Sequence, residues 1–193
     1  MSIKKLFVAF SALFLVSPAF LQAAAQTNVM VIDQAKIMTQ SKAGKDISKK
    51  LQNIAEQMNK ELKPTADSLQ AEGKSLQTTL APLNQNAIAQ DKALVTRIQN
   101  FEKRRVELQK TQQKRAAELE LTKRDAWNKF FQALEPALKD AIAESNADIV
   151  IDRSSTIHTG EGVEKTDLII SKLDASTPTI AVTKQSLPAP TKQ

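Results

Sequence analysis

The chain has 193 residues, no cysteine and few aromatic residues, which make up 4% of the total. The absence of cysteine excludes disulfide bonds, thiolate catalysis and cysteine-based zinc sites. A hydrophobic share of 41% is slightly below that of an average soluble domain, and 27 basic against 21 acidic residues give a net charge of +6. The composition excludes a large compact core but suits a coiled coil with one small domain.

Residues 1–25 have the pattern of a secretory signal peptide. Lys4 and Lys5 supply positive charge, an apolar run follows over residues 6–16, and Ala23 and Ala25 are the small residues that a signal peptidase reads. The apolar run is too short to span a bilayer, so a membrane anchor is disfavoured. We predict cleavage after Ala25 and an exported mature protein.

The mature chain begins with a β-branched run at residues 28–33, which includes Val29 and Val31. Such a run predicts a short strand buried on both faces. Gly44 then marks the start of a long segment, residues 41–146, that is dense in Gln, Lys, Glu, Ala and Leu.

This long segment predicts two helices, each with one apolar stripe. The apolar residues recur mostly at steps of three, four or seven. Many are eleven apart, an interval close to the natural helical repeat, so the coil should be nearly straight. The residues spaced in this way are Ile47, Met58, Leu69 and Leu80 in the first half, and Leu108, Leu119 and Phe130 in the second.

A turn near residues 82–88 separates the halves. Pro82 disfavours helix at the residue before it, and Asn84 and Asn86 suit turns and helix starts. Two striped helices joined by a short turn form an antiparallel hairpin. Such arms must project from a small body, and Pro64 should kink the first arm.

The remaining strands are expected after the hairpin. Residues 147–152, with Ile149 and Ile151, predict a second strand, and residues 155–158 could form a third. Thr166 resembles the N-cap of a short final helix. We therefore predict a β-body from residues 26–40 and 147–174. The Ser-, Thr- and Pro-rich residues 175–193 predict a mostly disordered tail, although residues 179–183 could add a strand.

Nothing in the chain predicts an enzyme, a metal site or a cofactor. His158 is the single histidine, and Ser155 and Asp152 lie near it in sequence. Local spacing does not establish a catalytic triad, and no Gly-x-Ser-x-Gly turn is present. A polar residue at a strand end is the favoured interpretation of His158. Acidic residues are scattered without the spacing of metal ligands.

The strongest candidate for a binding site is the basic second arm. Between residues 97 and 129, ten basic residues outnumber five acidic ones. The cluster could attract acidic partners by long-range charge, or it could be an ordinary solvated helix face. Trp127 and Phe131 are expected to pack at the arm roots rather than to touch a partner. The predicted binding residues are Arg97, Lys103, Arg104, Arg105, Lys110, Lys114 and Arg115.

The order strand, long hairpin, strand resembles the OmpH-like family of periplasmic chaperones over residues 26–174. The resemblance depends on residues 29–33, 41–45 and 148–152, and on Thr166, Asp167 and Leu173 of the final helix. It implies a homotrimer whose three hairpins surround a cavity below a shared β-body. The body residues predicted to join the chains are Val29, Val31, Ile149 and Ile151.

The resemblance also implies a function and a location. A periplasmic, ATP-independent holdase of this kind binds unfolded outer-membrane β-barrel proteins in the cavity and prevents their aggregation. Lipopolysaccharide or another anionic lipid is a further possible partner, whereas nucleic acid is not expected for an exported protein. The alternative is a structural spacer or adaptor of an envelope complex. The modestly apolar tip at residues 81–83 leaves that alternative open.

Overall fold

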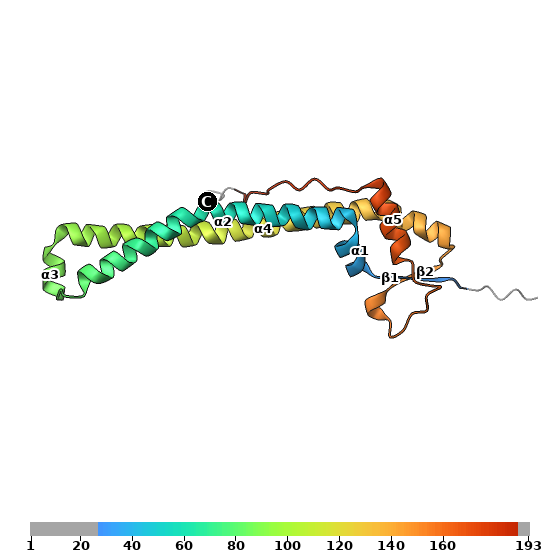
Figure 1. The fold of residues 1–193 in the computed structure, drawn as a ribbon, viewed down its shortest axis with the longest axis horizontal. Coiled ribbons are helices and arrows are strands. Elements are labelled where there is room, and N and C mark those ends of the chain that lie inside the picture. The colour runs from blue at the N-terminus through green and yellow to red at the C-terminus, as the bar shows by residue number, and fades with distance from the viewer. Residues whose placement is uncertain (1–26, 189–193) are drawn as a thin grey trace, which may run out of the picture.

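The computed structural model describes residues 27–188, so the predicted signal peptide lies outside the described residues. Two long helices fold back on each other and project from a small region that holds the strands (Figure 1). The predicted fold class, mostly helical with a long hairpin and a small sheet, is confirmed. The elements are β1 (Val29–Ile32), α1 (Gln34–Gln40), α2 (Lys42–Leu80), α3 (Gln85–Gln90), α4 (Lys92–Ser145), β2 (Ile149–Asp152), the 3-10 helix η1 (Arg153–Ser155) and α5 (Thr166–Ser176).

The two predicted strands pair in parallel, with Val31 of β1 opposite Ile151 of β2. The other edge of β1 meets residues 163–165. The N–H of Val31 donates to the Val163 carbonyl at 2.8 Å, and the Val31 carbonyl accepts from the N–H of Lys165 at 2.9 Å. β1 is therefore the central strand. The predicted burial holds for Val31, which is 3% exposed, but not for Val29, which is 36% exposed.

The third strand predicted at residues 155–158 is wrong. Asp152 ends β2 and caps η1 by accepting a hydrogen bond from the N–H of Ser154 at 2.8 Å. The hydroxyl of Ser154 donates to the same carboxylate, and these bonds lower the pKa of Asp152. They turn the chain into η1, so residues 163–165 take the place beside β1.

A tight connection joins α1 to the first arm. Ser41 caps α2 by accepting from the N–H of Gly44 at 3.1 Å, and its side chain is fully buried. Gly44 packs so closely on the carbonyl oxygen of Met38 that no Cβ would fit there. This close approach sets the turn between the two helices and requires glycine.

The hairpin buries one stripe from each arm, as the periodicity predicts. Ile47, Met58 and Leu69 of α2 are buried, and Leu80 is half-buried at the end of the helix. Both long helices continue through their prolines without a break. Among residues 27–188, none of the helices combines the length and apolar character needed to cross a bilayer. The stripe of α4 consists of Leu94, Glu118, Thr122, Ala126, Phe130, Leu134, Ala137 and Ala141.

The tip contains a short helix as well as a turn. Asn84 caps α3 by accepting from the N–H of Ala87 at 2.9 Å, as its residue type predicts. Asp91 then caps α4 by accepting from the N–H of Leu94 at 2.9 Å. At the far end, Asn146 takes a left-handed conformation, with φ of 46°, and directs the chain from α4 into β2.

One hydrophobic cluster holds the arms, α1, α5 and the sheet together. We call this cluster the root. The predicted N-cap role of Thr166 is wrong, because Thr166 is the first residue of α5 and Lys165 precedes it as the N-cap. The Thr166 hydroxyl instead accepts from the N–H of Asp33 at 2.8 Å, and Glu164 accepts from the N–H of Thr166. The buried root residues include Met30, Ile37, Ile47, Phe130, Leu134, Ile169, Leu173 and Ile180.

The expected disordered tail is replaced, over residues 177–188, by an extended segment that lies along the hairpin (Figure 1). We call this segment the strap. Ile180 is 5% exposed and belongs to the root cluster, and Val182 packs against that cluster. Residues 179–183, which could have added a strand, form no strand pairing but lie on an apolar surface of the arms. Residues 189–193 lie outside the described residues.

The two glycines of α2 should respond oppositely to alanine. Gly44→Ala forces a Cβ into the Met38 carbonyl, so we expect a loss of about 1–3 kcal/mol in the free energy of unfolding. Gly73→Ala places its Cβ 3.4 Å from the ring of Phe101, an ordinary contact. It should stabilise the helix by up to about 1 kcal/mol. Urea unfolding measures both changes, and equal effects would contradict the packing at the α1–α2 turn.

Candidate functional site

Two of the predicted basic residues tie the arms together. Arg97 of α4 donates to Glu72 of α2 at 2.6 Å and to the hydroxyl of Ser75 at 2.8 Å. Nearer the root, Arg115 binds Glu61 across the hairpin at 2.9 Å. Both arginines are half-buried. Their guanidinium groups therefore stabilise the pairing of the arms, a use for which a planar, forked donor is well suited.

The contact between Arg97 and Glu72 shifts both pKa values. The hydrogen bond from Arg97 is the main cause that holds the pKa of Glu72 below its ordinary value, against an opposing desolvation. The same bond raises the pKa of Arg97. Because the folded-state pKa of Glu72 is lowered, its stabilising contribution is present at neutral pH and is lost as the pH falls through that lowered pKa.

Arg115 also binds a buried carboxylate that sequence reasoning missed. Glu118 is 2% exposed, and its carboxylate accepts from Arg115 at 3.2 Å and lies 3.9 Å from the ammonium of Lys114. A buried charge without a partner is strongly unfavourable. Arg115 and Lys114 therefore stabilise the buried charge of Glu118 within the arm. The signal in the sequence was a glutamate on the buried stripe, four residues before Thr122.

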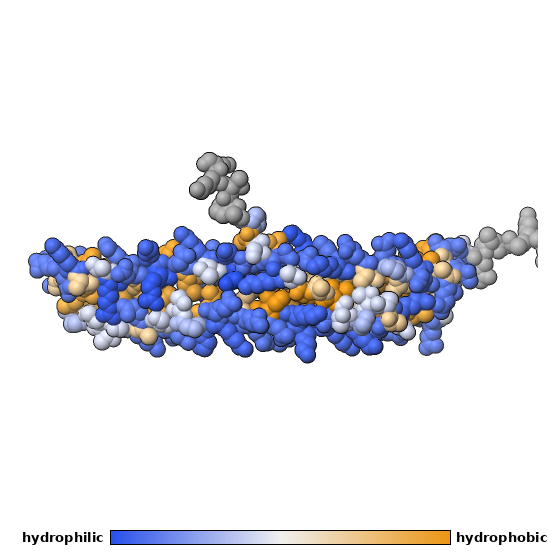
Figure 2. All heavy atoms as spheres, turned by 90° about the horizontal axis from the view of Figure 1, so that it is seen from above, coloured by the Kyte–Doolittle hydropathy of each residue, from blue (hydrophilic) through white to orange (hydrophobic). Residues whose placement is uncertain are grey.

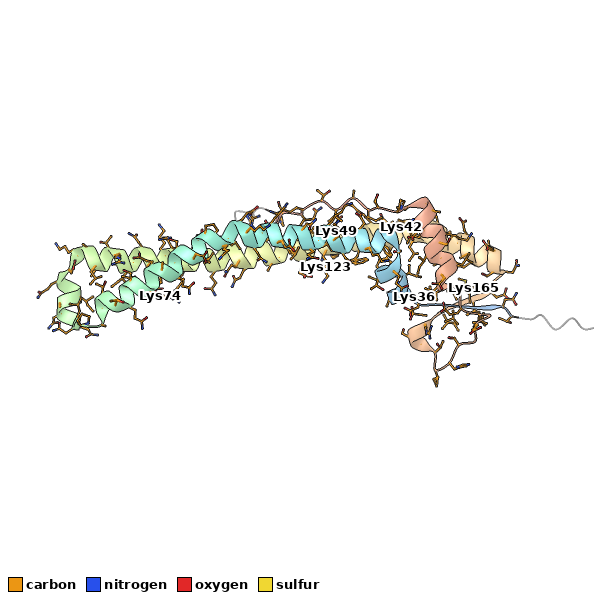
Figure 3. The ribbon with its side chains drawn as sticks, in the orientation of Figure 1. Lys36, Lys42, Lys49, Lys74, Lys123 and Lys165 are labelled. Carbon is orange, nitrogen blue, oxygen red and sulfur yellow. The ribbon has the colours of Figure 1, made fainter. Side chains whose placement is uncertain are left out.

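The remaining predicted basic residues leave cationic surface on the distal half of α4. Lys103 and Lys110 are exposed, and within residues 27–188 neither forms an ion pair. Arg104 donates to Ser68 at 3.0 Å, and Arg105 pairs with Glu102 at 2.7 Å. Other lysines also project outward from both arms, as Lys74 and Lys123 do in Figure 3.

Two apolar openings lie between the arms midway along the hairpin. The larger has a volume of about 330 Å³ and the smaller about 240 Å³, and Leu62 lines both. Alanines on both helices make room for the larger opening because their side chains do not reach across the seam. Arg115 lines the larger opening and Arg104 the smaller, so each combines apolar walls with a cation. The larger is lined by Ala55, Met58, Asn59, Leu62, Lys63, Ala66, Gln112, Arg115, Ala116 and Leu119.

These openings explain one difference from the predicted stripe. Leu108 and Leu119 of α4 were expected in the seam, but both are half-buried because each lines an opening. On the face shown in Figure 2, apolar side chains form an interrupted band between rows of polar ones. Apolar surface is therefore accessible along the arms.

The aromatic cluster belongs to the root. Phe130 is fully buried, and its ring packs edge-on against Trp127 at 5.3 Å and against Phe131 at 5.6 Å between centroids. Trp127 packs against the root cluster, which agrees with the predicted packing role. Phe131 keeps 38% of its surface exposed.

The residues near the single histidine do not form a triad. His158 is exposed, and the Asp152 carboxylate binds Ser154 rather than Ser155. In the part of the chain that the structure describes, no group of three or more His, Cys, Asp or Glu side chains could hold a metal ion.

The sheet exposes apolar side chains on the body. Val29, Ile149 and Val150 are 36%, 45% and 37% exposed, and Ile157 is completely exposed. Within residues 27–188, β2 pairs with β1 alone, so its outer edge keeps unpaired backbone groups. An exposed apolar edge strand is a surface on which another chain can pair.

This architecture has counterparts among known proteins. Residues 28–173 match the family described as outer membrane protein (OmpH-like). The chain belongs to the OmpH-like family. The resemblance to this family inferred from the sequence is thereby confirmed.

An OmpH-like fold is also seen in a solved structure. The crystal structure of a candidate OmpH-like outer membrane chaperone from Caulobacter crescentus CB15 matches with a TM-score of 0.71 and 22% identity. The match covers 84% of this chain and 93% of that chain. At this identity it shows the fold and assigns no residue of a site. No curated protein matches the chain.

The buried carboxylate in this OmpH-like arm provides a sharp test. Arg115→Met should lower the free energy of unfolding by about 2–4 kcal/mol, because it leaves Glu118 buried without its guanidinium partner. The double variant Arg115→Met, Glu118→Leu should recover most of the loss. Arg105→Met is the matched control, since its exposed partner Glu102 limits the effect to below about 1 kcal/mol. Chemical denaturation that shows equal losses for both single variants would contradict the account.

Proposed function

We propose that the protein is a periplasmic, ATP-independent holdase that binds unfolded outer-membrane β-barrel proteins between its arms and prevents their aggregation. The observation that carries this proposal is the accessible apolar surface along a projecting hairpin, with cations beside it. Unfolded β-barrel chains present alternating apolar residues and aggregate readily. Many weak apolar contacts can hold such a chain and still release it.

The location in the proposal rests on the sequence. Residues 1–25 have the composition of a cleavable signal peptide, with cleavage after Ala25. Export would place the arms in the compartment that unfolded outer-membrane proteins cross. Membership of the OmpH-like family supports the same location.

The basic residues Lys103, Arg104, Arg105 and Lys110 supply the charge in this proposal. Exposed charges act over about 8–10 Å at physiological salt. They therefore speed the encounter with an acidic chain more than they add to its affinity. Lipid phosphates are a second anionic partner that the same residues would attract. In contrast, Arg97 and Arg115 are engaged with α2 and contribute to the shape of the arm.

Three chains are proposed to join through the exposed body. Val29, Ile149 and Val150 lie together on the paired strands β1 and β2, and a two-stranded sheet is marginal by itself. Association of three copies would cover these side chains and the outer edge of β2. The hairpins would then surround a common space. An adaptor function is less well supported, because Leu83 is the one large apolar residue exposed at the tip among the described residues.

An aggregation assay tests the proposed function directly. A urea-unfolded outer-membrane β-barrel protein is diluted into buffer with and without this protein, and light scattering is followed. We expect suppression at about one trimer per client, without ATP. Unchanged scattering at a severalfold excess of trimer would contradict the holdase proposal.

Charge reversal tests the role of the basic residues. Replacing Lys103, Arg104 and Arg105 by Glu should slow capture of an acidic client by about 10-fold at low salt, because steering depends on charge. The salt dependence of the capture rate should also flatten. Stopped-flow fluorescence measures both quantities.

A control for this charge reversal comes from the first arm. Lys49, Lys60 and Lys74 are exposed on α2, and their replacement by Glu changes the net charge equally. If both triple variants lose the same capture rate, net charge rather than the basic face of α4 governs the encounter.

Oligomerisation has its own test. Multi-angle light scattering of the mature protein should give three times the mass of one chain. Ile149→Asp should abolish the trimer by placing a charge in the proposed interface, whereas Val106→Asp should leave it intact. Val106 is equally exposed, at 44%, but lies on the arm. A wild-type protein that is a folded monomer at micromolar concentration would refute the proposed assembly.

A further inference from the structure

The strap, residues 177–188, lies on the arms as an extended peptide would lie on a receptor. It leaves α5 and follows the hairpin toward the tip (Figure 1). Ile180 is buried and Val182 half-buried against the arms, whereas Ala181 and Thr183 are exposed. Over residues 180–183 the strap therefore presents every second side chain to the arms, as an extended segment does.

Most polar contacts between the strap and the arms are made by the strap backbone, and the side-chain amide of Gln185 adds one donor to the Asp125 carboxylate at 3.5 Å. The N–H of Ile180 donates to the Asp46 carboxylate at 3.0 Å, and the carbonyl of Ile180 accepts from the ammonium of Lys50 at 2.8 Å. Farther toward the tip, the N–H of Gln185 donates to the hydroxyl of Thr122 at 2.9 Å. The arms thus provide both a donor and acceptors for an extended main chain.

The carboxylate of Asp46 beneath the strap has a lowered pKa. Partial desolvation raises the pKa of Asp46, but the hydrogen bonds from Lys50 and from the N–H of Ile180 outweigh it and leave that pKa below its ordinary value. The acceptor for the strap is therefore a carboxylate at neutral pH. The 2.7 Å contact between Lys50 and Asp46 also orients both groups toward the strap.

Hydrogen bonds to the backbone of a docked segment depend little on the amino-acid sequence of that segment. Main-chain hydrogen bonds supply affinity to any extended segment, and an apolar surface selects segments with an apolar residue at every second position. We propose that the surface beneath the strap is a docking site for such segments of unfolded polypeptide, and that the strap occupies it until a client displaces the strap. The identity of the displacing chain rests on the proposed holdase function.

The chemistry of the expected client matches the strap. A transmembrane β-strand alternates apolar and polar residues over about 9–11 positions, and the strap presents one repeat of such an alternation, at Ile180 and Val182. The surface also continues beyond the strap. Leu119, which lines the larger apolar opening, lies one helical turn from Thr122 toward the tip. A client segment longer than the strap could therefore dock in its place and extend into this opening.

The test uses full-length mature protein with the strap released by substitution. Ile180→Asp with Val182→Asp places two charges against the apolar surface and should free the strap. Ala181→Asp with Thr183→Asp is the matched control, because it adds the same charges to the exposed face of the same segment. Circular dichroism and light scattering verify that each variant retains its fold and assembly.

The probe is a fluorescein-labelled peptide with the sequence of residues 177–188, followed by fluorescence anisotropy. It should bind the released variant at least about 10-fold more tightly than the wild type or the control, since an occupied site lowers apparent affinity by its free fraction. A urea-unfolded outer-membrane β-barrel protein should displace the peptide. The same client should bind the released variant more tightly than the wild type.

Each other outcome overturns a defined part of the account. Equal peptide binding by the released variant and the wild type would show that the strap covers no docking site. A client that binds every variant but leaves the peptide in place would refute client docking here and leave the holdase proposal intact. If no variant binds the client, the holdase proposal fails, and displacement by clients fails with it.

If the double aspartate variant does not fold, a milder variant tests whether the strap covers a docking site. Gln185→Pro removes the N–H that bonds Thr122 and leaves Ile180 and Val182 unchanged. It should release the distal part of the strap and raise peptide and client affinity in the same direction by a smaller factor. Wild-type affinities in this folded variant would overturn the inference.

Discussion

The whole structure depends on the contacts at the root that join the segments before and after the hairpin. Strand β1 precedes the hairpin in the sequence and β2 follows it. Beside this strand pair, the N–H of Asn28 donates to the Asp148 carboxylate at 2.9 Å, although the two residues are 120 apart in sequence. A hairpin of two helices buries only one stripe from each, which is marginal for long arms in water. The root supplies the missing burial by packing Met30, Phe130 and Ile169 from three different parts of the chain into one cluster.

Burial decreases from the root toward the tip, and the proposed function follows from this gradient. Beyond the root the seam is interrupted by openings beside Leu62, and farther out it depends on a few buried residues such as Leu76 and Leu94. Low contact density gives low local stability. Arms of this kind can adjust to an unfolded chain while the root keeps its shape, and Arg97 and Arg115 prevent the arms from separating completely.

Local patterns predicted much of the fold and less of the candidate site. The eleven-residue spacing of Ile47, Met58 and Leu69 defined the first arm, because helical periodicity is a local property. In contrast, the pairing of Arg97 with Glu72 depends on the register between the arms, which no local pattern specifies. The docking of the strap was not predicted for a related reason: Ile180 packs into the root cluster and its backbone bonds Asp46 and Lys50, residues far away in sequence.

Hydrogen–deuterium exchange of the free protein measures the stability gradient most directly. The account predicts the slowest exchange at root amides such as those of Ile47, Phe130 and Ile169. It predicts faster exchange in α2 and α4 beside the openings, and the fastest in residues 81–91. Uniform protection along both arms, or slower exchange at the tip than at the root, would contradict a stable root that carries adaptable arms.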